Sequence, residues 1–103
     1  MLEEFTNQTF DALLGQRFEV VPTHGHPFVM VLAECRRVGD MPPDDLGFAI
    51  RREPFCLLFY TGRDVVVPQQ ICRMRNRHLG EFSMFIVPVG PDQRGMRYEA
   101  VFT

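Results

Sequence analysis

Residues 81–90 of the chain read EFSMFIVPVG, and residues 96–102 read MRYEAVF. Both stretches are rich in the β-branched and aromatic residues that favour strands, and the PDQRG segment between them is typical of a turn. In the second stretch Met96 and Tyr98 share one parity and Arg97 has the other. This period of two is typical of a half-buried strand. The sequence therefore predicts a hairpin that closes the fold.

A third strand precedes this hairpin. Residues 71–77 read ICRMRNR, which alternates strictly between inward and outward candidates. The residues at 78–80 predict a three-residue loop with glycine in its last position. Such a loop places Arg77 opposite Glu81 and pairs the two strands face by face.

The rest of the chain predicts more strands. The long segment from Phe28 to Val38 is apolar on both parities at its start, and so is the segment from Phe55 to Tyr60. Such segments indicate strands covered on both faces. Further extended segments are predicted at 17–21, 48–52 and 65–67.

One helix is predicted, at residues 5–15. Thr6 is a candidate N-cap, Thr9 is a second candidate, and Gly15 is the C-terminal stop. Phe10, Leu13 and Leu14 have the spacing of one helical face. A helix this short is not stable alone, so we expect it to lie on the sheet or to close one end of a barrel.

These elements predict a mainly β fold. The expected architecture is a compact antiparallel barrel or a two-sheet sandwich of about six to eight strands, in an up-and-down order, with one short N-terminal helix. The chain has 103 residues, and we expect residues 1–103 to form a single β-rich domain.

The composition narrows the function classes. The formal net charge is -2, which argues against a nucleic-acid partner. The N-terminus does not resemble a signal peptide, and no apolar run is long enough to span a membrane. From the sequence we expect a bacterial, cytoplasmic protein that does not bind membranes.

Residues that could carry catalysis or bind a metal are few. His24 and His26 flank a turn glycine, and His78 could join them only if the fold brought it close, so no metal site is predicted. The acidic residues at 39–47 lack the spacing of a calcium loop. No nucleophile elbow or phosphate-binding loop is present, and we expect no cofactor and no catalytic residue. The three cysteines are expected to be reduced core residues: Cys35, Cys56 and Cys72.

The most informative candidate site is a row of arginines. Arg73, Arg75 and Arg77 fall two residues apart, which puts three guanidinium groups on one face of a strand. With Glu81 opposite, this row is a candidate surface for binding an acidic partner or a polyanion. The alternative is ordinary cross-strand pairing with neighbouring carboxylates, which contributes under about 1 kcal/mol for each exposed pair.

Several segments together resemble a family of small bacterial proteins of unknown function. They are LLGQ (13–16) with Phe18, REPF (52–55) with LLF (57–59), LGE (79–81), VPVG (87–90) and MRYEAVF (96–102). The resemblance implies an accessory, adaptor or chaperone role beside phage-tail-collar-like or tail-fibre-like proteins. The matching residues are of the types that form turns and core. The acidic, proline-containing segment 39–47 departs from the pattern.

Two functions follow as hypotheses. The first is a non-enzymatic module that binds a protein partner or itself. The second is a small-ligand-binding barrel or minor enzyme with an aromatic-lined pocket. An interior filled by the aromatic side chains would weigh against the second.

Overall fold

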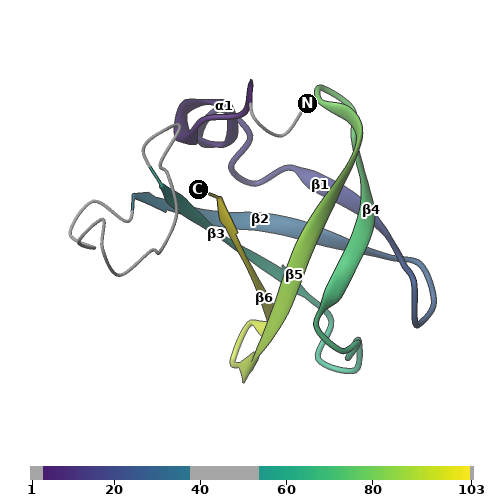
Figure 1. Cartoon of the computed structure of the whole chain (residues 1–103). Coiled ribbons are helices and arrows are strands. Elements are labelled where there is room, and N and C mark those ends of the chain that lie inside the picture. Colours follow the sequence, from purple (N-terminus) through teal and green to yellow (C-terminus); the bar gives the residue numbers. More distant parts are fainter. Residues whose placement is uncertain (1–3, 38–53, 103) are drawn as a thin grey trace, which may run out of the picture.

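The computed structural model describes residues 4–37 and 54–102. These residues form a closed barrel of antiparallel strands with a short helix across one end (Figure 1). The mainly β fold is confirmed, and of the two predicted architectures the barrel is the one formed. The predicted strand at 48–52 and the acidic segment 39–47 lie outside the described residues. The elements are α1 (Asn7–Asp11), β1 (Arg17–Pro22), β2 (Phe28–Arg37), β3 (Phe55–Thr61), β4 (Gln70–Asn76), β5 (Gly80–Asp92) and β6 (Gly95–Phe102).

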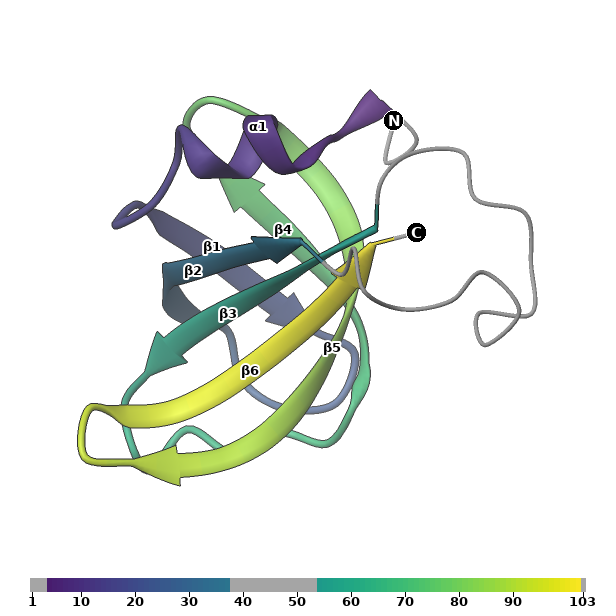
Figure 2. The same cartoon turned by 90° about the vertical axis from the view of Figure 1, so that its left-hand side faces the viewer.

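The order of the strands differs from the predicted up-and-down order. Around the barrel it is β1-β2-β3-β6-β5-β4, and β4 pairs back to β1. Strands β3 and β4 are consecutive in the chain but are not neighbours, because β3 pairs with β6 instead. The connection 62–69 therefore lies at the end of the barrel opposite α1 (Figure 2). Closure gives every described strand two partners and leaves no exposed sheet edge.

The predicted extended segment at 65–67 belongs to this connection and is not a strand. The hydroxyl of Tyr98 accepts a hydrogen bond from the backbone N–H of Val67 at 2.9 Å and donates one to the carbonyl of Val65 at 2.8 Å. The side chain of Val67 is buried in the core. Tyr98 thus holds the connection across the barrel end, where the sequence pattern indicated only an extended chain.

The change Tyr98→Phe is expected to lower the free energy of unfolding by about 1–3 kcal/mol, because it leaves buried backbone groups without a partner. Urea titration should show a lower midpoint with an unchanged slope. Tyr60→Phe is the matched control, since the Tyr60 hydroxyl bonds Asp92 at the surface. An equal loss in both variants would show that the Tyr98 hydroxyl does not hold the connection.

Helix α1 is shorter than predicted. After Asp11 the chain continues in turns, in which backbone hydrogen bonds join residues three apart. The N–H of Leu13 bonds the carbonyl of Phe10 at 2.9 Å, and the N–H of Gln16 bonds the carbonyl of Leu13 at 3.0 Å. This tighter winding turns Leu14 outward, and its side chain is 48% exposed. The predicted apolar face therefore keeps Phe10 and Leu13 but not Leu14. Thr6 is the N-cap, as predicted.

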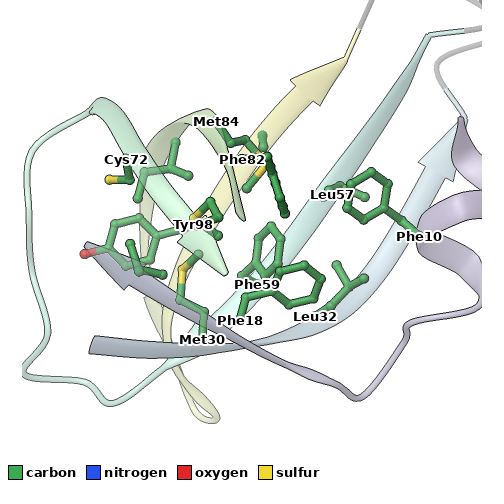
Figure 3. Packing of buried hydrophobic residues seen from close by; sticks show 14 of the residues in the cluster. Phe10, Phe18, Met30, Leu32, Leu57, Phe59, Cys72, Phe82, Met84 and Tyr98 are labelled. Atoms are coloured by element: carbon green, nitrogen blue, oxygen red, sulfur yellow. The ribbon is translucent and has the colours of Figure 1, made fainter. Parts of the chain in front are cut away.

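Aromatic side chains fill the barrel (Figure 3). Phe10, a residue of α1, is fully buried, and its ring contacts the rings of Phe18, Phe55 and Phe102. The rings of Phe55 and Phe102 are stacked with their centroids 4.7 Å apart. Because these rings contact one another, they serve as core, and this packing weighs against an aromatic-lined ligand pocket.

Candidate functional site

The predicted arginine row lies on the outside of the barrel. Along β4 the residues alternate strictly between buried and exposed, so that Arg73 and Arg75 point to solvent while Met74 between them is buried. Arg77 follows in the next turn and is also exposed. The period-two pattern thus correctly predicted the orientation of this row.

The pairing of β4 with β5 differs from the predicted register. Arg75 lies opposite Glu81 and Arg73 opposite Ser83, whereas the sequence predicted Arg77 opposite Glu81. A shift by an even number of residues keeps every side chain on its face. Arg73 forms the ion pair with Glu81, with 3.7 Å between Nη2 and Oε2. Both side chains are largely exposed, so this pair adds little stability.

A buried asparagine causes the shifted register. The side chain of Asn76 accepts hydrogen bonds from the backbone N–H groups of His78 at 2.8 Å and Leu79 at 3.2 Å. These bonds close the loop over residues 77–79, whereas the prediction placed it at 78–80. The sequence pattern could not reveal this, because the same alternation fits both loops.

Strand β1 adds two charged residues that the sequence analysis did not include in the site. Glu19 pairs with Arg75, and Arg17 lies two residues before Glu19 on the same face of β1. The amide of Asn76 donates a hydrogen bond to the carbonyl of Arg17 at 3.1 Å, which holds the two strands together here. The outward orientation of Arg17 and Glu19 could be predicted from their spacing. Their position beside β4 depends on barrel closure.

These side chains surround an open depression of about 700 Å³ on the barrel surface. We call this depression the arginine groove. A smaller depression of about 190 Å³ adjoins it, shares Glu19 and Arg75, and reaches Arg73 and Glu81. The arginine groove is lined by Gly15, Gln16, Arg17, Glu19, Val29, Arg75 and Arg77.

The charge of the arginine groove is mostly uncompensated. Arg17, Arg75 and Arg77 are exposed. None of them forms an ion pair within residues 4–37 and 54–102. Glu19 is the one carboxylate among the lining residues. The groove is therefore positive on a chain whose net charge is -2.

Arginines at the far end of the barrel have structural partners instead. The Tyr60 hydroxyl donates a hydrogen bond of 2.6 Å to the Asp92 carboxylate, which raises the pKa of Tyr60 and lowers that of Asp92. Arg63 and Arg97 donate hydrogen bonds to backbone carbonyls at 2.8 and 3.1 Å. The guanidinium of Arg94 lies 4.3 Å from the centre of the Tyr60 ring. This contrast sets the groove arginines apart.

His78 lies at the other end of the barrel from His24 and His26. His24 and His26 are exposed in the turn after β1, near the end where Pro22 pairs with Cys72. His78 lies in the turn after β4, at the end near α1 (Figure 1). In the part of the chain that the structure describes, no three His, Cys, Asp or Glu side chains gather as metal ligands.

The cysteines are not activated thiols. Burial raises the pKa of Cys35 to about 11, with a further contribution from Asp11. Burial and the neighbouring Glu99 raise the pKa of Cys56 to about 12. Burial also raises the pKa of Cys72. A thiol with a raised pKa stays protonated near neutral pH and is a weak nucleophile.

Fold and site together define a small antiparallel β-barrel with a filled core and a positively charged groove on its outer wall. A family model described as "Domain of unknown function (DUF6916)" matches residues 5–102, and the chain belongs to this family. The resemblance to a family of unknown function is thereby confirmed. No curated protein and no solved structure matches the chain. Across the described residues, no helix has the length and apolar character needed to cross a membrane.

Proposed function

We propose that this protein is a non-enzymatic binding module and that a protein partner docks on the arginine groove. One observation carries this proposal: Arg17, Arg75 and Arg77 are exposed around one depression, without ion pairs in the described part of the chain. Charged groups left without a partner on one face favour association with a complementary surface. The protonated thiols and the contacting core rings give no support to a competing catalytic site.

The resemblance noted from the sequence supports a more specific role. We propose that the protein is an accessory component, an adaptor or chaperone, for a tail-fibre-like protein in the bacterial cytoplasm. A barrel with paired strands and a rigid outer face is a suitable scaffold for such docking, because little order is lost on binding. Self-association through the same face is the competing outcome.

Site-specific photocrosslinking tests this function. A photoreactive residue at Val29, in the groove wall, is expected to give a discrete adduct with one partner in cells that contain the native assembly. The adduct should disappear when Arg75 and Arg77 are both replaced by alanine and should persist in Arg36→Ala, because Arg36 does not line the groove. A photoreactive residue at Val101, on β6, serves as the position control.

Three results would contradict the proposal: no adduct from Val29, equal adducts from Val29 and Val101, or an adduct that survives loss of both arginines. An adduct between two copies of this chain would show that the groove mediates self-association and does not bind a partner protein.

A further inference from the structure

The arginine groove contains an unfavourable arrangement of like charges. Arg17, Arg75 and Arg77 line the same depression on the outer face of the barrel. Like charges that line one depression repel one another. Glu19 lies opposite Arg75 but forms no ion pair of 4.0 Å or less with it, so the groove keeps a positive excess that a bound anion would neutralise.

The backbone that carries these arginines is held in place before any ligand binds. Asn76 is 3% exposed, and its amide bonds the carbonyl of Arg17 while its oxygen bonds the turn that contains Arg77. Met74 anchors the strand from the core side. The guanidinium groups are thus attached to fixed positions, which lowers the ordering cost of binding.

The spacing of the groove charges indicates the form of the anion. Arg77 lies in the turn two residues after Arg75, so their Cα atoms are at most about 7 Å apart. Alternate side chains of an extended peptide are about 6–7 Å apart, and a guanidinium can donate two hydrogen bonds to one carboxylate as a bidentate pair. Strands β1 and β4 are paired on both sides, so a ligand contacts their side chains and does not add a strand.

The carboxylates near the groove argue against a continuous polyanion. Glu19 lines the groove and Glu81 lines the adjoining depression. A nucleic-acid backbone would bring phosphates against both of these groups, whereas a peptide can place uncharged or basic side chains there.

We propose that the arginine groove binds an extended acidic segment of a partner protein, with Asp or Glu at alternate positions facing Arg75 and Arg77. Arg17 shares the second carboxylate from the neighbouring strand. This inference rests on the proposed binding function and specifies the chemistry of the partner at that same groove.

A peptide binding assay tests the inference. The probe is a fluorescein-labelled peptide of alternating Glu and Ser, and the reference peptide has the same length and composition, arranged as Glu-Glu-Ser-Ser repeats. In an extended chain, the reference places successive carboxylates on opposite faces. Fluorescence anisotropy with the full chain at low ionic strength should show about tenfold tighter binding of the alternating peptide, and added salt should weaken it.

Arginine variants test whether the peptide binds at the arginine groove. The double variant Arg75→Ala with Arg77→Ala should lose about tenfold in affinity for the alternating peptide. Arg36→Ala with Arg94→Ala removes the same charge elsewhere on the barrel and should have little effect. Replacing Arg75 and Arg77 by Glu should abolish binding and create affinity for a peptide of alternating Lys and Ser. All four positions are exposed, and an unchanged thermal midpoint confirms folding.

The inference would be overturned by equal affinity for the two spacings or by equal losses in the two double variants. It would also be overturned by stronger binding of a single-stranded oligonucleotide of the same charge. If no peptide binds but the Val29 photoadduct forms and depends on the arginines, the acidic-segment inference fails while the docking function stands. If the adduct is absent as well, both fail.

Discussion

Replacing Phe10 by alanine is expected to lower the free energy of unfolding by about 3–5 kcal/mol. The side chain is fully buried, and its ring lies within 5.3 to 6.4 Å, centroid to centroid, of Phe5, Phe18, Phe55 and Phe102. Its loss leaves a cavity among four rings that cannot collapse together, because three of them belong to different strands of a closed barrel. The total free energy of unfolding of a domain of this size is only about 5–15 kcal/mol.

The local consequence is release of α1. This helix has five residues and cannot persist without the contacts of its buried face. The chain after it forms one wall of the arginine groove, since Gly15 N–H bonds the carbonyl of Leu32 at 2.8 Å and Gln16 follows. The Phe10→Ala variant should therefore also bind the acidic peptide more weakly at temperatures where the barrel is still folded.

Urea unfolding followed by circular dichroism measures the loss, because the chain has no tryptophan to report by fluorescence. Leu14→Ala is the matched control from the same segment, since its side chain is 48% exposed. We expect the control to lose under about 1 kcal/mol. Similar losses in both variants would show that Phe10 does not close the barrel end.

The second large effect is expected at Gly95, the first residue of β6, directly after the turn that follows β5. The change Gly95→Ala should cost about 3 kcal/mol or more, from backbone strain and a steric clash together. Gly95 has a φ of +143°, a conformation that L side chains rarely adopt. A Cβ there would also overlap the carbonyl oxygen of Thr61. That carbonyl cannot easily move, because Thr61 belongs to β3 and its backbone is paired with Met96 of β6.

Gly80→Ala separates strain from clash. Gly80 also has a positive φ, +75°, but a Cβ there would meet no atom within 4 Å. Strain alone should cost about 1–2 kcal/mol. Thermal or urea unfolding of both variants gives the difference. A loss at Gly80 as large as that at Gly95 would mean that the contact with Thr61 is not a constraint on the barrel.

The inward and outward faces of the strands could be predicted from the sequence because they depend on local periodicity. Side chains alternate along any strand, so Met74 was assigned to the face opposite Arg73 and Arg75, and Tyr98 to the face opposite Arg97, without knowledge of the partners. The predicted faces of this strand are correct although the register predicted at the turn after Asn76 is wrong. Two loops that differ by an even shift present the same faces, and only the buried amide distinguishes them.

Long-range pairing could not be read from the chain, because the energies that choose between strand neighbours come from contacts distant in sequence. Hydrophobic alternation permits both an up-and-down order and the observed one. The structure favours the second through the pairing of β3 with β6 and through the Tyr98 hydroxyl, which binds the connection 62–69 across the barrel end.

The candidate site also has one part that the sequence predicted and one part that only the tertiary structure shows. The row of Arg73, Arg75 and Arg77 is a property of one strand, and its spacing alone predicted it. The groove is a property of two strands that barrel closure brings together, β1 and β4, and Arg17 and Glu19 enter the site only through that contact. Local periodicity sets the direction of each side chain, whereas its neighbours are set by which strands close the barrel.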